Sequence, residues 1–192
     1  MQIGVLALQG DFAEHQAMLE SLGARVRQVR LPAHLDGLQG LIIPGGESTT
    51  IGKLANAYGL TDALRVFALD KAVWGTCAGA IFLAKDAGLA QPLLGVMDIV
   101  IARNAFGRQV DSFEVELNIP ALINSSGGNP PYHAVFIRAP LIESIGPGVE
   151  SLAKLENGKI VAARQGKLLA TSFHPELTRD ARFHQYFLEM AK

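Results

Sequence analysis

Short apolar runs alternate with helical patterns through the first half of the chain. The runs are rich in β-branched residues and stop at glycine, proline or polar positions, which predicts buried strands at residues 3–9, 25–30, 40–44 and 72–76. Residues 12–22 instead repeat apolar positions at helical spacing, with His15 on the apolar face and Gly23 as the C-terminal cap. Further helices are predicted at residues 48–59, at residues 61–70 with Thr61 as N-cap, and at residues 78–83.

The second half of the chain is dominated by strand-like patterns. Strands are predicted at residues 98–103, 112–118, 134–140, 159–164 and 167–173. Few helical segments separate them, so antiparallel pairing is expected, with tight turns at residues 156–159 and 164–167. Residues 124–132, "NSSGGNPPY", are typical of an exposed loop, and residues 179–190 predict a closing helix.

Strands separated by helices predict an α/β fold with a mixed, mainly parallel sheet covered on both faces, a three-layer sandwich. The chain has no internal repeat and no linker-like segment, and its 192 residues suit one domain spanning residues 1–192. In such sheets the ligand crevice lies beyond the carboxyl ends of the strands. Residues that follow the predicted strands are therefore the candidates for chemistry.

Charge and cysteine content narrow the functional classes. The 17 basic and 18 acidic residues nearly cancel, which argues against a nucleic-acid or membrane-surface partner. No apolar run reaches the ~20 residues needed to cross a bilayer, and the first residues lack the basic region of a leader, so a soluble, cytoplasmic protein is expected. A single cysteine, Cys77, permits neither an internal disulfide nor a cysteine-based metal cluster. Chemical reactivity of the thiol remains as a reason for the presence of Cys77.

Cys77 occupies the centre of a Gly-x-Cys-x-Gly pattern, Gly75 to Gly79, between a predicted strand and a predicted helix. This is the context of a nucleophile elbow, a sharp turn that requires small neighbours and lifts the nucleophile clear of the sheet. The helix start favours a thiolate, and the N–H of Ala78 can point at an oxyanion. The alternative is a buried cysteine that only fills space, which the two glycines make the weaker hypothesis.

A thiolate nucleophile needs a base, and "SFHPEL" supplies His174 and Glu176 at the end of the last predicted strand. Pro175 favours an extended conformation at His174, so the two side chains could project to the same side and the carboxylate could fix the imidazole tautomer. These residues would act as nucleophile, general base and orienter. Taken without the elbow, the tripeptide is more typical of a surface His and Glu beside a turn proline.

"LIIPGGESTT" is a strand that runs into glycines and then opens a helix. The N–H of Gly46 is a candidate second oxyanion donor, because adjacent glycines allow unusual backbone angles. The alternative is a plain turn with Ser48 or Thr49 as N-cap. The segment is not a phosphate-binding P-loop, because it lacks the required glycine spacing and the Lys-Ser/Thr pair.

Two arginines follow later strands. Arg103, in "ARNAFGRQ", could clamp a carboxylate, and Arg138, in "FIRAP", ends a strand; either could instead be a solvated surface arginine. Among the histidines, His15 is expected to be packed or partly solvated. Three others have no metal-ligand spacing, so no metal is assigned: His34, His133 and His184.

Together these motifs resemble the class I (triad) glutamine amidotransferases, and within them the glutaminase subunits of pyridoxal 5′-phosphate synthase. The motifs occur in the family's order along nearly the whole chain: "LALQGDFAEH", "LIIPGGESTT", "WGTCAGAI", "RNAFGRQ", "FIRAP" and "SFHPE". The elbow and His-Pro-Glu are shared by amidotransferases generally. The combination of "PGGESTT" with "RNAFGRQ" points to the vitamin B6 branch.

The resemblance implies a flavodoxin-like amidotransferase fold and an activity. L-Glutamine would be deamidated through a γ-glutamyl thioester on Cys77, with His174 and Glu176 completing the triad. The backbone of Gly46 and Ala78 would hold the oxyanion. The positions that match the family's substrate-binding residues are Gly46, Glu47, Ser48, Arg103, Ile137 and Arg138.

The resemblance also implies a partner. A synthase subunit of (β/α)₈ type would receive the ammonia and combine it with a pentose phosphate and glyceraldehyde 3-phosphate, in an assembly of twelve glutaminases on a dodecameric synthase. Pyridoxal 5′-phosphate would be the partner's product, so no cofactor is expected on this chain. One departure is visible, because the segment before "FIRAP" is a few residues longer than the family pattern; the contacts of this loop near Arg138 stay open.

Two other functions remain open at this point. The same chemistry could serve another synthase, for instance one of the purine, histidine or tryptophan pathways. The elbow cysteine could alternatively belong to a redox-sensing or chaperone-like α/β protein without turnover. That hypothesis gives Glu176 and the glycine pair no evident purpose.

Overall fold

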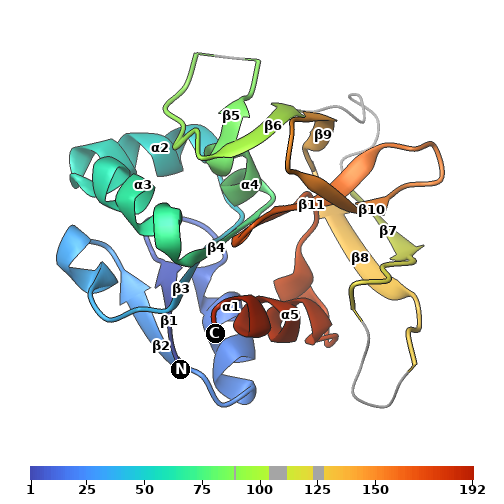
Figure 1. Ribbon diagram of the computed structural model, residues 1–192, viewed down its shortest axis with the longest axis horizontal. Helices are drawn as coiled ribbons and strands as arrows, with labels where there is room; N and C mark the ends of the chain where they lie inside the picture. Colours follow the sequence, from blue (N-terminus) through green and yellow to red (C-terminus); the bar gives the residue numbers. More distant parts are fainter. Residues whose placement is uncertain (89, 104–111, 123–127) are drawn as a thin grey trace.

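The computed structural model describes residues 1–88, 90–103, 112–122 and 128–192. Figure 1 shows a large curved sheet with helices on both sides and a separate hairpin at one end. The strands are β1 (Gln2–Leu6), β2 (Arg25–Val29), β3 (Gly40–Ile43), β4 (Ala72–Thr76), β5 (Ala84–Asp86), β6 (Met97–Ala102), β7 (Ser112–Leu117), β8 (Tyr132–Ile137), β9 (Leu141–Ile145), β10 (Glu150–Lys154), β11 (Ile160–Gln165) and β12 (Leu168–Thr171). The helices are α1 (Phe12–Ser21), α2 (Ser48–Ala57), α3 (Leu60–Asp70), α4 (Ala78–Leu83) and α5 (Arg182–Met190), with the 3₁₀ turns η1 (Pro32–Leu35) and η2 (Pro175–Leu177).

The described strands form a mixed sheet in the order β2-β1-β3-β4-β12-β11-β9-β6-β5, with β10 paired to β11. Pairing is parallel from β2 through β12, as βα units require, and antiparallel where β11 meets β12, β9 and β10. β7 and β8 form the separate antiparallel hairpin. The predicted mainly parallel sheet and the antiparallel second half are therefore confirmed.

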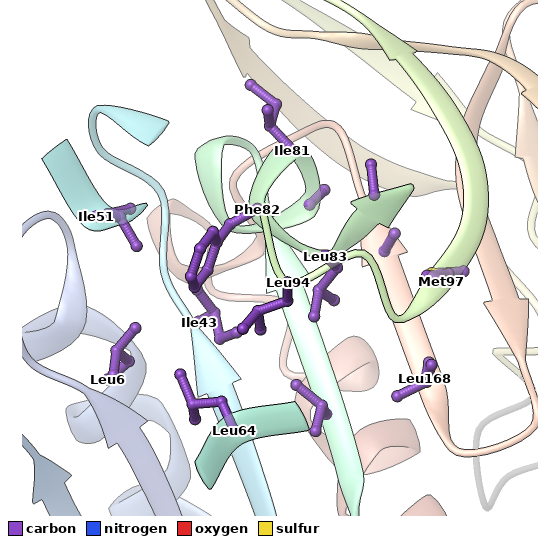
Figure 2. Packing of buried hydrophobic residues seen from close by; sticks show 14 of the residues in the cluster. Leu6, Ile43, Ile51, Leu64, Ile81, Phe82, Leu83, Leu94, Met97 and Leu168 are labelled. Carbon is purple, nitrogen blue, oxygen red and sulfur yellow. The ribbon is translucent and has the colours of Figure 1, made fainter. Parts of the chain in front are cut away.

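Alternate side chains of the central strands enter two different hydrophobic clusters, one on each face of the sheet. In β3, Leu41 and Ile43 join the cluster under α2, α3 and α4, which Figure 2 shows from close by, while Ile42 points to the opposite face. There, Leu19 of α1 and Phe187 of α5 complete the second cluster. Because both faces are covered, these strands are continuous apolar runs. The predicted three-layer arrangement is thus the observed one.

Several predicted boundaries were wrong. β1 ends at Leu6, three residues before its predicted end, and in the segment that follows Gln9 Oε1 accepts the N–H of Glu47. α3 begins at Leu60, and its N-cap is Gly59 in the left-handed region (φ 67°), whereas Thr61 lies inside the helix with its hydroxyl on Asn56. α5 begins at Arg182, three residues later than predicted. The short strands β5, β9 and β10 were not predicted.

The sheet order brings two strand ends together. β4 and β12 are parallel neighbours in register, with Thr171 opposite Thr76, and the N–H of Cys77 bonds to the carbonyl of Thr171 at 2.8 Å. The segments that follow these two strands therefore leave the same edge of the sheet side by side. Within the described residues, none of the helices has the length and apolar character of a membrane span.

Candidate active site

Cys77 lies on a sharp turn between β4 and α4. Its φ of 47° and ψ of −106° are rare for a residue with a side chain, and such strain persists only where the surroundings enforce it. The side chain is 7% exposed. α4 begins at Ala78, directly after the cysteine, as predicted. The expected nucleophile elbow is therefore the observed geometry.

The glycines beside Cys77 are required by close backbone contacts. A Cβ on Gly75 would collide with the backbone of Gly79 and Ala80, and a Cβ on Gly79 would collide with the carbonyl group of Ile43 at the end of β3. The start of α4 is thus pressed against the neighbouring strand. This contact fixes the direction in which the first N–H groups of the helix point.

His174 and Glu176 lie beside the elbow, on the segment that follows β12. His174 Nδ1 is 2.6 Å from Glu176 Oε1, and both residues are almost fully buried. The pair forms because Pro175 starts the 3₁₀ turn η2, and not because two strand residues share a face, as the sequence suggested. The N–H of His174 is anchored to the carbonyl of Val135 in β8 at 2.9 Å.

The electrostatics of the pair favour a protonated imidazole. Burial by itself lowers the pKa of His174, but hydrogen bonds with Cys77 and Glu176, together with their charges, raise this pKa to about 10. Burial raises the pKa of Glu176, and the hydrogen bond from His174 acts in the opposite direction. An imidazolium held between Cys77 and a carboxylate is suited to exchange protons with a sulfur nucleophile and its leaving group.

The loop after β3 faces this pair. Gly46 has a φ of 150°, and a Cβ there would collide with the side chain of Gln9. The Gly45 carbonyl accepts a hydrogen bond from the N–H of Asp11 at 3.2 Å, and a Cβ on Gly45 would collide with the His174 ring. The backbone of this loop therefore packs directly on the imidazole.

Glu47, and not Ser48 or Thr49, is the N-cap of α2. Its carboxylate accepts the N–H groups of Thr49 and Thr50, at 3.1 and 2.7 Å. Burial opposes ionisation, but the hydrogen bonds from Thr50 and Thr49 together outweigh it and lower the pKa of Glu47 to about 2. The carboxylate is therefore charged at neutral pH and complements the positive end of the helix.

We expect Glu47→Gln to destabilise the fold by about 1 kcal/mol at neutral pH, the usual effect of losing a helix cap. Because the folded pKa is lower than the ordinary value of 4.5, the contribution is complete above pH 4.5 and disappears as pH falls towards 2. Urea unfolding at pH 7 and pH 3 measures this, with Glu143→Gln on an exposed position of β9 as the control. An equal difference from wild type at both pH values would contradict the charge argument.

Arg103 extends from the end of β6 towards this cap. It donates to Gln91 Oε1 at 2.9 Å and lies 3.4 Å from Glu47 Oε1. Gln91 Oε1 also accepts the hydroxyls of Ser48 and Thr49, so one amide oxygen connects the arginine to the start of α2. The rest of the predicted motif, Asn104 to Gln109, lies outside the described residues, as does part of the predicted loop 124–132.

Ile137 and Arg138 border the other side of the elbow. The Ile137 carbonyl is 4.0 Å from Cys77 Sγ, and Arg138 has a φ of 43°, a rare value for a residue with a side chain. The bend directs the chain away from β8 immediately beside the cysteine. This position agrees with the one that the sequence motif suggested.

A cavity of about 460 Å³ opens between these elements. All of the predicted site residues except Glu176 line it, namely Gly46, Glu47, Ser48, Cys77, Ala78, Arg103, Ile137, Arg138 and His174. Glu176 stands behind His174. The cavity has room for an amino-acid-sized ligand, and two arginines are among its lining residues.

Sequence reasoning missed four polar residues around the site: Gln9, Asp11, His15 and Gln91. Gln9 Oε1 accepts the N–H of Glu47 at 2.7 Å, and Asp11 Oδ2 lies 3.5 Å from His174 Nδ1. Gln9 and Asp11 stand in the quoted segment "LALQGDFAEH", directly after β1. Their position after a parallel strand was a signal that could have identified them.

Within the part of the chain that the structure describes, one group of ligand-type side chains is close enough to bind a metal ion, namely Asp11, His174 and Glu176, whose ligand atoms lie within 4.8 Å of one another. His174 Nδ1 is already engaged by Glu176 at 2.6 Å. A metal bound there would have to break this pair. The donor set therefore fits a triad better than a metal site.

Comparison with known proteins agrees with this geometry. The family model described as "SNO glutamine amidotransferase family" matches residues 5–192. A pyridoxal 5′-phosphate synthase subunit PdxT of Herpetosiphon aurantiacus is 58% identical, covering 98% of this chain and 99% of that protein. The corresponding protein of Thermus thermophilus is 54% identical, with 98% and 97% covered.

Solved structures give the same result for the fold. One described as a glutamine amidotransferase superposes with a TM-score of 0.91 at 53% identity, covering 98% of each chain. Another, described as a GMP synthase component from Thermoplasma acidophilum, has 19% identity and a TM-score of 0.71, covers 100% of this chain and 94% of that one, and shows the shared fold alone. The full-length family match and the relatives above 50% identity establish that the chain belongs to the SNO glutamine amidotransferase family.

Proposed function

We propose that this chain is the glutaminase subunit of a pyridoxal 5′-phosphate synthase, which hydrolyses L-glutamine to L-glutamate and ammonia. The observation that carries the proposal is the buried line from Cys77 on a strained elbow through His174 to Glu176 at 2.6 Å. A redox sensor would need only the cysteine. The assignment to pyridoxal 5′-phosphate synthesis is taken from the names of the similar proteins.

The reaction would proceed in two steps on Cys77. Its sulfur attacks the side-chain amide carbon of glutamine, and the N–H groups of Gly46 and Ala78 stabilise the oxyanion. His174 then donates a proton to the amide nitrogen as the C–N bond breaks, which releases ammonia and leaves a γ-glutamyl thioester. Water, deprotonated by His174, hydrolyses the thioester to glutamate, while Glu176 holds the imidazole in place.

The two arginines give the cavity its substrate preference in this proposal. Arg103 would bind the α-carboxylate of glutamine, and Glu47, 3.4 Å from Arg103, and Ser48 would line the cavity with it. Ile137 and Arg138 would border the substrate on the opposite side. A rotation of the Gly45–Gly46 peptide could complete the oxyanion hole, since the hydrogen bond from the Asp11 N–H to its carbonyl, at 3.2 Å, is at the long end of the usual range.

The ammonia would pass to the synthase subunit without reaching bulk water. We infer a partner of (β/α)₈ type in an assembly of twelve subunits of each kind, with this chain acting as one domain and binding no cofactor. A cytoplasmic setting suits the proposal, because the one cysteine is used as a free thiol and needs a reducing compartment.

Glutamine labelled with ¹⁵N in its side-chain amide tests the proposal. When the partner that makes pyridoxal 5′-phosphate is present together with its sugar substrates, we expect glutamate release at least about ten-fold faster than from this chain alone. The label should appear in the ring nitrogen of pyridoxal 5′-phosphate. Mass spectrometry of the product and an assay of glutamate measure both.

Exogenous ¹⁵N-ammonium without glutamine is the control, since it supplies the synthase directly. A chain that binds this synthase but never transfers the label would contradict the proposal. Binding and activation by a purine, histidine or tryptophan pathway synthase instead would keep the chemistry and replace the partner. Inertness towards glutamine in every complex would favour the redox-sensing alternative.

A further inference from the structure

A second layer of buried imidazoles stands behind the Cys77–His174–Glu176 line. His15 on α1 and His184 on α5 are both fully buried, and their rings join through His15 Nδ1 and His184 Nε2 at 2.9 Å. α1 and α5 lie on the same side of the sheet (Figure 1). On its other side, His15 Nε2 lies 3.2 Å from Glu176 Oε2 and 3.2 Å from the hydroxyl oxygen of Thr76.

Both imidazoles are neutral. Burial, then the neighbouring His184 and His174, hold the pKa of His15 well below its usual range. Burial lowers the pKa of His184 to about 3. Trp74 packs against both rings in T-shaped contacts, at centroid distances of 5.7 and 5.0 Å. Each ring therefore has one N–H donor and one acceptor nitrogen.

Only one arrangement of these protons satisfies the buried groups. His184 Nδ1 makes no hydrogen bond within the described residues, so an N–H there would be a buried, unpaired donor. A buried acceptor nitrogen without a partner costs less free energy than a buried N–H without one. The proton of His184 is therefore on Nε2, facing His15 Nδ1. His15 then carries its own proton on Nε2, between Thr76 and Glu176.

The opposite arrangement would create two unfavourable contacts. It would leave an unpaired N–H on His184, and it would place a lone pair of His15 Nε2 3.2 Å from a carboxylate oxygen. Glu176 Oε2 makes no hydrogen bond within the described residues, and His15 Nε2 lies beside it at 3.2 Å without the alignment of a hydrogen bond, so the N–H dipole of His15 acts on this oxygen through proximity. Buried carboxylate oxygens need such a dipole.

We propose that His15 is a positioning residue of the glutaminase, whose Nε2–H attracts the outer oxygen of Glu176 electrostatically so that the inner oxygen stays on His174, and that His184 fixes the tautomer of His15 required for this. The proposal rests on the proposed glutaminase function. Its rival is a purely structural role, in which His15 and His184 only fill the space beside Trp74. The two differ in what a replacement does to the triad.

Substitutions at His15 separate the two roles. A glutamine nitrogen reaches about as far as His Nε2, whereas leucine fills similar space without a donor. In the complex with the synthase, we expect His15→Leu to lower kcat about 10- to 100-fold with little change in KM, the usual effect of losing a partner one shell behind the reacting groups. His15→Gln should recover most of this loss, and His184→Leu should give a smaller loss.

A second measurement probes the electrostatics of the triad without glutamine turnover. The rate at which iodoacetamide alkylates Cys77 follows the thiolate beside the His174 imidazolium. A Glu176 that is no longer held would stabilise this imidazolium less, so the alkylation profile of His15→Leu should move to higher pH, and that of His15→Gln should stay near wild type. The titratable groups that face His15 are Glu176, His184 and His174.

Equal kcat values and equal alkylation profiles for His15→Gln and His15→Leu would overturn the proposal in favour of space filling. If His15→Leu does not fold, His15→Asn replaces it, because the asparagine nitrogen reaches only the Nδ1 position facing His184. The alkylation profile does not depend on glutamine, so an absence of glutamine hydrolysis in wild type would refute the proposed function and leave this test in force.

Discussion

Cys77→Ala is expected to abolish glutamine hydrolysis in the presence of the synthase, with a loss of about 10⁴-fold or more in kcat. Without the sulfur no thioester can form, and His174 has no nucleophile to activate. The fold should survive, because the substitution removes one atom at a site whose side chain is already small. Glutamate release and the melting temperature of the same preparation measure both effects.

Ser172→Ala is the matched control for this variant. Ser172 is fully buried two residues before His174, and its hydroxyl makes no hydrogen bond within the described residues. It should retain wild-type activity, which would exclude a general sensitivity of this region to truncation. Substantial hydrolysis by Cys77→Ala would refute the covalent mechanism.

Gly79→Ala is expected to damage both stability and catalysis. The added Cβ would collide with the carbonyl groups of Ile43 and Pro44, so α4 must move away from the end of β3. Overpacking of this kind typically costs about 1–3 kcal/mol. Displacement of the Ala78 N–H should lower kcat about 100-fold, as expected for a lost oxyanion donor. Urea unfolding and the coupled glutaminase assay report the two effects.

Gly37→Ala is the control that separates the effect of backbone strain from the effect of a collision beside the active site. Gly37 has a φ of 75° and open space around its Cα, far along the chain from the elbow, so alanine there should cost about 1–2 kcal/mol from backbone strain alone. Its kcat should stay at the wild-type value. If Gly79→Ala lost stability but kept full kcat, the start of α4 would not be part of the catalytic geometry.

The parts of the site that could be predicted from sequence are those fixed by local sterics. A strand, a glycine, a cysteine and a second glycine leave few conformations open, so Cys77 and Ala78 were placed correctly. His174 and Glu176 were paired correctly for a different local reason, a proline that starts a turn. Arg103 could be placed at the end of its strand, but its bonds to Gln91 and Glu47 could not.

The parts that were missed depend on contacts between distant segments. His15 carried a helical pattern that fits an ordinary packed residue, and only the folded chain brings it to Glu176 and His184. The strands β9, "LIESI", and β10, "ESLAK", are too polar to stand out as apolar runs. β9 forms between the edges of β6 and β11, and β10 forms along β11. Strands that depend on such pairing partners cannot be predicted from the local pattern of apolar and polar residues.

The hydrogen-bond ladder between β4 and β12 also fixes the distance between the nucleophile and the base of the triad. With Thr76 opposite Thr171, the nucleophile follows its strand by one residue and the imidazole follows its own by three. A slip of one residue would carry His174 about 3.3 Å along the sheet and reverse the face of every β12 side chain. That displacement exceeds the tolerance of a hydrogen bond. The distance between Cys77 and His174 is therefore set mainly by the backbone pairing of two strands, and the side chains in the loops only adjust it.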